Sequence, residues 1–206
     1  MQFAQNAVQN YCRITQRFIA FAPNRTERER RNAVSTVFLA LLAGLSVPCF
    51  ACLYHFLNFD TAAIIVLYGG AAMICTPLVL RATQSNVFGR EYFISAFYIM
   101  KMVLAYYLGG IAAPTLPWLL LCPMVAMALG SVRSCAQWGI FVTATVMGMF
   151  YVQTRGLIAF PGIPFADQRL LQVVSILGLF IFSAILLLFL KPGGSVKLAR
   201  FGSNTN

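Results

Sequence analysis

The stretch Ala33–Leu57, AVSTVFLALLAGLSVPCFACLYHFL, decides the class of this protein. It runs for 25 residues without an Asp, Glu, Lys or Arg. About 20 mostly apolar residues are enough for an α-helix to cross the hydrocarbon core of a bilayer. This stretch therefore predicts a transmembrane helix.

The composition of the whole chain agrees with that first prediction. Of the 206 residues, 60% are hydrophobic and 10% are charged, whereas about 25% are charged in a typical soluble domain. Such a chain has too little polar surface for an ordinary soluble fold, and it is too hydrophobic to be disordered. We expect an all-α polytopic membrane protein.

Five further apolar runs follow the first one, so we expect six transmembrane helices packed in a bundle that occupies residues 26–190. The fourth and fifth runs are short, at about 15 residues or about 22 Å of helix. Four spans with re-entrant segments are therefore the main alternative. The five further runs are 61–80, 92–109, 117–131, 137–152 and 170–190.

The distribution of Lys and Arg predicts the orientation. With the N-terminus inside the cell, the inner segments hold twelve of these residues and the outer loops hold only Arg155 and Arg169. Positively charged loops stay on the cytoplasmic side of the membrane. We therefore expect a multi-pass inner-membrane protein with both termini in the cytoplasm. The twelve inner residues are Arg13, Arg17, Arg25, Arg28, Arg30, Arg31, Arg81, Arg90, Arg133, Lys191, Lys197 and Arg200.

The two ends of the chain have different characters. Residues 1–25 place apolar side chains at helical steps on one face, which favours an amphipathic helix on the inner membrane surface over a dimerising coil. The spacing of Thr26 and Glu29 fits a capping box at the start of the first long helix. Pro192 and the glycines after it predict that the last helix ends there, followed by a flexible cytoplasmic tail over 191–206. The leader's apolar residues are Phe3, Ala7, Tyr11, Ile14, Phe18 and Phe21.

Lys101 is the most unusual residue, because it lies about midway along the third apolar run. A charge near the centre of a bilayer costs roughly 2.5–3.5 kcal/mol on insertion scales, and such residues commonly contact ligands or ions. The alternative is a structural lysine whose ammonium is satisfied by nearby carbonyls or hydroxyls. Polar, aromatic and helix-kinking residues of the central spans complete the predicted ligand-binding set. That set is Tyr98, Lys101, Tyr106, Trp118, Pro123 and Pro77.

Cys49, Cys52 and His55 are spaced three apart in the first span. Soft ligands of this kind suit a soft metal or a redox dithiol, although cysteine is common in apolar helices. We expect no metal site and no cofactor.

The chain also lacks the motifs of the common hydrolases, metalloproteases and nucleotide-binding loops, and its basic residues fit membrane orientation better than nucleic-acid binding. We therefore predict no catalytic residue and no nucleic-acid partner.

The segment Gly109–Trp118, GGIAAPTLPW, is followed by a proline at Pro123 and by Gly130-Ser131-Val132-Arg133. This pattern resembles the six-span N-terminal input region of bacterial sensor histidine kinases and related membrane-anchored cyclases. The resemblance implies a dimeric membrane sensor that passes a signal through its last helix to a cytoplasmic output domain. This chain has no phosphoacceptor helix and no ATP-binding domain, so it is a histidine kinase only if it is part of a longer protein.

We therefore expect a non-catalytic sensory module of a two-component-type system, surrounded by membrane lipid, with a small or lipophilic ligand and a second copy of itself as partners. Two alternatives stay open at the level of sequence. One is a small multi-span transporter, for example of a soft metal held by Cys49, Cys52 and His55. The other is a structural subunit of a larger membrane complex.

Overall fold

The computed structural model describes residues 27–161 and 165–190, and within these ranges the chain is helical without any strand. The predicted amphipathic leader and the predicted flexible tail lie outside the described residues. The elements, in chain order, are α2 (Glu27–Phe56), α3 (Asp60–Ile74), α4 (Thr76–Thr83), α5 (Asn86–Tyr107), the 3-10 turns η1 (Gly110–Ala112) and η2 (Leu116–Leu120), α6 (Leu121–Leu129), α7 (Val132–Thr154) and α8 (Phe165–Leu190).

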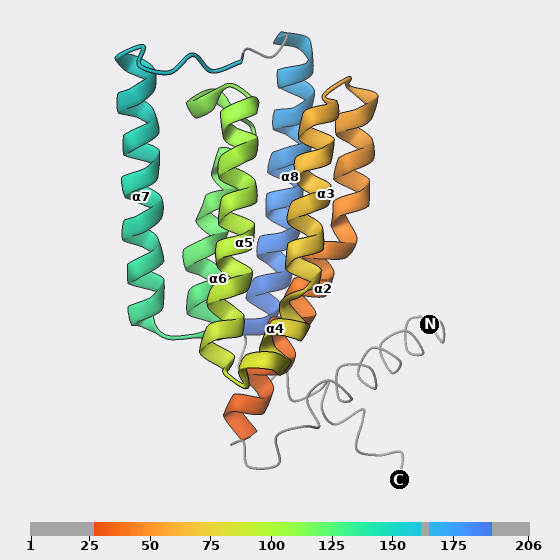
Figure 1. The fold of residues 1–206 in the computed structure, drawn as a ribbon, viewed down its shortest axis with the longest axis vertical. Helices are drawn as coiled ribbons and strands as arrows, with labels where there is room; N and C mark the ends of the chain where they lie inside the picture. The colour runs from red at the N-terminus through yellow and green to blue at the C-terminus, as the bar shows by residue number, and fades with distance from the viewer. Residues whose placement is uncertain (1–26, 162–164, 191–206) are drawn as a thin grey trace.

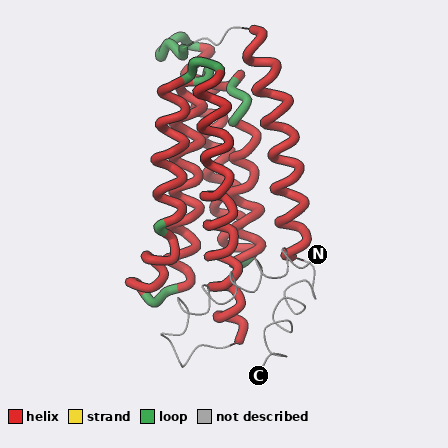
Figure 2. The backbone as a smooth tube through the Cα atoms, turned by 90° about the vertical axis from the view of Figure 1, so that its right-hand side faces the viewer, coloured by secondary structure: helices red, strands yellow, loops and turns green. Residues whose placement is uncertain are grey.

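The long helices run side by side, up and down, as the all-α prediction expects (Figure 1). Helix α2 packs on α3, α3 on α5, α5 on α6 and α6 on α7, so neighbours in sequence are mostly neighbours in space. Helix α8 packs on one side of the bundle, where it contacts α6 and η2 (Figure 2). The helices stay nearly parallel when the molecule is turned by a quarter (Figure 2).

Four helical segments are long and apolar enough to cross a membrane. They correspond to the first, second, fifth and sixth predicted spans. The fifth is longer than expected, because α7 begins at Val132, directly after Ser131, whose side chain accepts a hydrogen bond from the Ser134 amide. The four segments are Asn32–Phe56, Asp60–Thr83, Val132–Thr154 and Gln168–Leu187.

The other two predicted spans have different features. Helix α5 has 22 residues, but every stretch of 18 residues within it contains Arg90, Glu91 and Lys101. The fourth predicted span is the shorter apolar segment Leu116–Leu129, formed by η2 and α6. Both lie within the same bundle as the four long segments. By length and composition, four of the six predicted spans in the described residues are candidates to cross a membrane.

The three prolines that the sequence places inside spans act differently. Pro48 lies within the continuous helix α2. Pro77 lies in the first turn of α4, directly after the break at Cys75, because proline cannot donate the backbone hydrogen bond that a continuous helix requires. Pro123 lies in the first turn of α6, where a missing N–H breaks no helical hydrogen bond.

The connection from α5 to α6 is compact and largely buried. Gly109 and Gly110 adopt φ values of 101° and 69°, a left-handed conformation that favours glycine. Side chains from α7 and α8 satisfy its backbone: Gln153 Oε1 accepts from the Ile111 amide at 2.9 Å, and Gln168 donates to the Ala112 carbonyl at 3.3 Å. Irregular backbone at membrane depth is tolerated where protein groups satisfy it in this way.

Small residues allow close helix packing on one side of the bundle and not on another. A side chain at Gly44 would collide with Ile74, and one at Gly70 would collide with Val47, so α2 and α3 lie very close. Gly139 and Gly148 on α7, by contrast, have open space around their Cα atoms. Gly44 of α2 therefore serves internal packing, whereas Gly139 and Gly148 of α7 do not.

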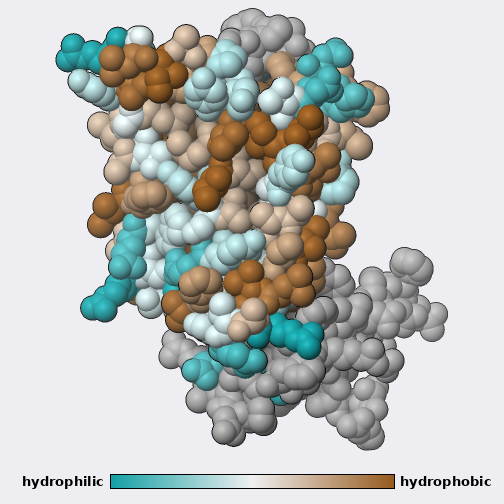
Figure 3. Space-filling view, viewed as in Figure 1, coloured by the Kyte–Doolittle hydropathy of each residue, from teal (hydrophilic) through white to brown (hydrophobic). Residues whose placement is uncertain are grey.

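The outer surface has the polarity expected of a membrane bundle. Only 11% of the apolar window of α7 and 17% of that of α8 are buried, against 44% for α2, so α7 and α8 turn most of their apolar side chains outward. On the face shown in Figure 3 the strongly hydrophilic residues gather mainly near the two ends.

Candidate ligand site around Lys101

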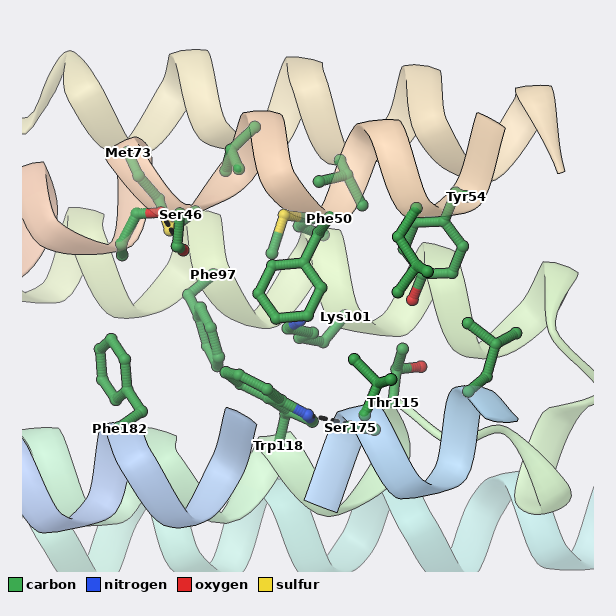
Figure 4. A pocket seen from close by; sticks show the side chains of 17 residues that line it. Ser46, Phe50, Tyr54, Met73, Phe97, Lys101, Thr115, Trp118, Ser175 and Phe182 are labelled. Carbon is green, nitrogen blue, oxygen red and sulfur yellow. Dashed lines mark hydrogen bonds between the residues drawn. The ribbon is translucent and has the colours of Figure 1, made fainter. Parts of the chain in front are cut away.

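Lys101 is buried at 8% exposure in the interior of the bundle. Its ammonium nitrogen lies 4.3 Å from the ring centroid of Trp118, 5.4 Å from that of Phe97 and 5.9 Å from that of Phe50. The rings come from η2, α5 and α2, so three separate elements form a cage around one cation (Figure 4). A desolvated cation–π contact contributes about 2 kcal/mol, most strongly with tryptophan.

A hydrogen-bond chain fixes the orientation of Trp118. Its indole nitrogen donates to Ser175 Oγ at 2.7 Å, and Ser175 in turn donates to the carbonyl oxygen of Pro114. Ser175 belongs to α8, whereas Pro114 belongs to the turn after α5. The indole that faces Lys101 is therefore held by the last helix, and a shift of α8 would change the surroundings of the lysine.

The cage borders a small internal cavity of about 40 Å³. Two hydroxyl-bearing side chains line it besides Ser46 and Ser175. Thr115 is 2% exposed, and its Oγ1 has no hydrogen-bond partner among the described residues. Tyr54 is 5% exposed. In Figure 4, Phe97 and Trp118 lie to one side of the Lys101 ammonium, and Tyr54 and Thr115 lie to the other.

The ammonium itself makes no hydrogen bond and no ion pair within the part of the chain that the structure describes. The acids with described side chains lie elsewhere: Glu29 is exposed near the start of α2, Asp60 pairs with His55 at 2.7 Å, and Glu91 pairs with Arg90 at 2.6 Å. The aromatic faces thus stabilise the charge on one side, while its N–H donors have no acceptor among the described residues. A buried donor without an acceptor costs about 1–3 kcal/mol.

Of the six predicted ligand-binding residues, the structure brings Lys101 and Trp118 together and separates the others from them. Tyr106 packs against Tyr107 and Phe160 near the end of α5. Pro77 lies at the break between α3 and α4, and Pro123 is half-buried in the first turn of α6. None of these three lines the cavity.

Tyr98 belongs to a second polar cluster, between α5 and α7. Its hydroxyl is 2.7 Å from Thr145 Oγ1, and its ring packs against Trp138. About two helical turns away on α5, Glu91 accepts hydrogen bonds from Trp138 Nε1 at 2.7 Å and from Ser134 Oγ at 3.0 Å. Partial burial opposes ionisation of Glu91, but these hydrogen bonds and the neighbouring Arg90 outweigh it and lower the pKa of the carboxyl.

Sequence reasoning missed Phe50, Phe97, Thr115 and Ser175. Phe97 precedes Lys101 by four residues, so helical spacing alone places it on the same face. Phe50, Thr115 and Ser175 come from distant parts of the chain, and only the packing of α2, the turn and α8 brings them to the lysine.

The cysteine and histidine pattern of the first span does not form a metal centre in this structure. Cys49 and Cys52 are exposed, and the His55 imidazole is next to Asp60. Within residues 27–161 and 165–190, no three His, Cys, Asp or Glu side chains come close enough to hold a metal ion.

A wider hollow of about 590 Å³ lies between α7, α8 and the segment that runs from η1 to η2. Its lining is apolar apart from Gln172 and includes Val142, Val146 and Ile176. It has no charged group that would select a ligand, so Lys101 and its cage remain the better candidate site.

No protein-family model, no curated protein and no solved structure matches this chain. The function therefore has to be argued from the geometry.

Proposed function

We propose that this chain is a membrane-embedded sensory or signal-input module in which a ligand bound beside Lys101 changes the packing of α8. The observation that carries the proposal is the connection from Lys101 to Trp118 and from Trp118 to Ser175 of α8. A ligand that interacts with the ammonium acts directly on the ring that α8 holds. A ligand shifts such an equilibrium by its difference in affinity for the two packings.

The proposed module crosses the inner membrane six times and has both termini in the cytoplasm. Helix α5 is 22 residues long, or about 33 Å, which matches the hydrocarbon thickness of about 30 Å. The start of α2 and the turns before α5 and before α7 lie at one end of the bundle (Figure 1). That end holds Arg30, Arg81, Arg90 and Arg133, whereas the opposite end holds Arg155 and Arg169. The positive-inside rule supports this orientation.

The resemblance to six-span sensor regions adds a dimeric state and a two-component role to the proposal. In this chain the segment Gly109–Trp118 has a definite structural task, because its turn delivers Trp118 to the lysine. A second copy of the chain and a kinase-type output are expected partners.

The test compares the native chain with Lys101→Met in lipid nanodiscs, using hydrogen–deuterium exchange of α8 as the measurement. We expect both proteins to insert, and we expect the amides around Ser175 to exchange at different rates in the two. Thr76→Val is the control, because Thr76 is also buried but does not line the cavity. Identical exchange of α8 in the native protein and in Lys101→Met would contradict the proposal.

Two other functions are tested with the same protein variants. Lys101-dependent movement of a solute across the membrane of sealed vesicles would favour a transporter over a sensor. A stoichiometric protein partner whose loss unfolds the chain would favour a structural subunit. The metal-transport alternative has no geometric support among the described residues.

A further inference from the structure

The charge balance around Lys101 is incomplete. The cavity lining includes one cationic side chain and no carboxylate. The Cys122 thiol is a buried neighbour on α6, and buried thiols behave as small hydrophobic groups. An ionised ammonium in such surroundings needs a counter-ion, because an isolated buried charge is far more costly than a paired one.

The hydrogen-bonding groups at the cavity point to an acceptor. Lys101 Nζ can only donate. Thr115 Oγ1 is buried and lacks a partner, so its hydrogen is free to be donated. The Ser175 and Ser46 hydroxyls, by contrast, already donate to the carbonyl oxygens of Pro114 and Ala43. A ligand that complements these donors accepts hydrogen bonds, as an anion does.

The direction of approach is restricted by the rings. Aromatic faces carry negative potential, so they stabilise the ammonium but repel an anion. Phe50, Phe97 and Trp118 face the Lys101 ammonium, so an anion is least repelled on the remaining side, toward Thr115 and Tyr54 (Figure 4). Thr115 lines the cavity on that side, and its buried Oγ1 has no hydrogen-bond partner among the described residues.

The cavity volume limits the size of the ligand. A water molecule needs about 10–15 Å³ on this scale, so about 40 Å³ accommodates roughly three water-sized groups. This is enough for a halide, nitrate or the carboxylate of a short acid. It is too little for a phospholipid headgroup or for an alkyl chain, and one ammonium does not neutralise a divalent anion.

We propose that this cavity binds one small monovalent anion, with Lys101 Nζ and Thr115 Oγ1 as its hydrogen-bond donors. The inference rests on the proposed function in one respect only, namely that the bound anion acts as the stimulus. Binding itself is a property of the cavity and is measured without any output.

The experiment uses the fluorescence of Trp118 in the full chain in nanodiscs. The chain has two tryptophans, so Trp138→Phe leaves Trp118 as the only indole. Bromide, a heavy-atom quencher, is titrated at constant ionic strength with sodium sulfate as the balancing salt. We expect quenching that saturates, because bromide bound at Lys101 lies next to the indole, and we expect acetate and nitrate to compete with it.

Matched variants in the Trp138→Phe background identify the donors. Lys101→Met should abolish the saturating phase. Thr115→Val should weaken bromide binding about tenfold, since it removes one hydrogen bond to a charged group, and Thr115→Ser should restore it. Thr76→Val removes an equally buried, unpartnered hydroxyl outside the cavity and should leave the affinity unchanged.

Quenching that rises linearly with bromide, or equal affinity in Thr115→Val and Thr76→Val, would overturn the inference even if Lys101→Met failed to fold. Competition by decanoate without competition by acetate would also overturn it and would identify a lipid-derived carboxylate as the ligand. Saturable anion binding with unchanged hydrogen exchange in α8 would preserve the anion site and refute the sensory function.

Discussion

The link between Trp118 and Ser175 gives the sharpest quantitative test of the packing. Ser175→Ala leaves two buried groups without a partner, namely the Trp118 indole N–H and the Pro114 carbonyl oxygen. Each unsatisfied buried group costs about 1–3 kcal/mol in soluble proteins, whereas hydrogen bonds between membrane helices average about 0.6 kcal/mol and reach about 1.7. We take about 1 kcal/mol for each group and expect Ser175→Ala to lower the free energy of unfolding by about 2 kcal/mol.

A double-mutant cycle separates the indole from the carbonyl. In a Trp118→Phe background the indole donor is already absent, so Ser175→Ala strands only the Pro114 carbonyl and should cost about 1 kcal/mol. The coupling energy between Trp118 and Ser175 is then about 1 kcal/mol. Reversible unfolding of the four proteins in mixed micelles measures it.

Strictly additive effects of the two substitutions would refute the reasoning, because they would show that α8 does not hold the indole. Thr76→Val serves as the control for general loss of a buried hydroxyl, since the Thr76 hydroxyl has no hydrogen-bond partner to strand.

Three further predictions concern other parts of the bundle. Lys101→Met should insert fully and unfold at no lower a temperature than the native chain in detergent, because it removes a buried charge that costs about 2.5–3.5 kcal/mol on insertion scales; a lower unfolding temperature would show that the ammonium is well paired. The pKa of Glu91 is lowered in the folded protein. The Glu91 carboxylate therefore stabilises the fold at pH values above the ordinary pKa of 4.5, and this stabilisation is lost as the pH falls through the folded pKa. Glu91→Gln should flatten the loss of stability on acidification, and an unchanged acid profile would contradict this. Gly110→Ala should lower the free energy of unfolding by about 1 kcal/mol more than Gly156→Ala does. Both positions have positive φ, but only a Cβ at Gly110 would lie 2.5 Å from Gln153 Oε1. Equal costs of the two substitutions would exclude the contact.

The predicted spans differ in how far local sequence specifies them. The first and second are recognisable because long uncharged runs have few alternatives to a helix in lipid. The predicted fifth span starts at residue 137, five residues after α7 begins at Val132, since Val132–Ala136 is short and contains an arginine. In the structure the Ser131 cap defines the start of α7. The effect of Pro123 was also misjudged, because a proline in a first turn breaks nothing, and the position of that turn depends on where α6 begins.

The candidate site was predictable only in part for a related reason. A lysine in an apolar run is conspicuous, and its partner at the preceding turn, Phe97, follows from helical spacing. Tyr98 precedes Lys101 by three residues and belongs to the same predicted ligand-binding set, yet it contacts α7 through Thr145. Three residues at about 100° each place these two side chains about 60° apart around the helix, and the sequence does not say which neighbouring helix each of them meets.

The amino-acid sequence alone determined that this is a helical protein with apolar spans, a basic end and one buried cation. The reason is that each residue's backbone and charge have their own free-energy cost in an apolar environment. The tertiary structure alone decided that Lys101 meets Trp118, Phe50 and Phe97 and that the turn after α5 relies on Gln153, Gln168 and Ser175. Those contacts join residues up to 61 positions apart, and helix packing, which local propensity does not encode, sets them.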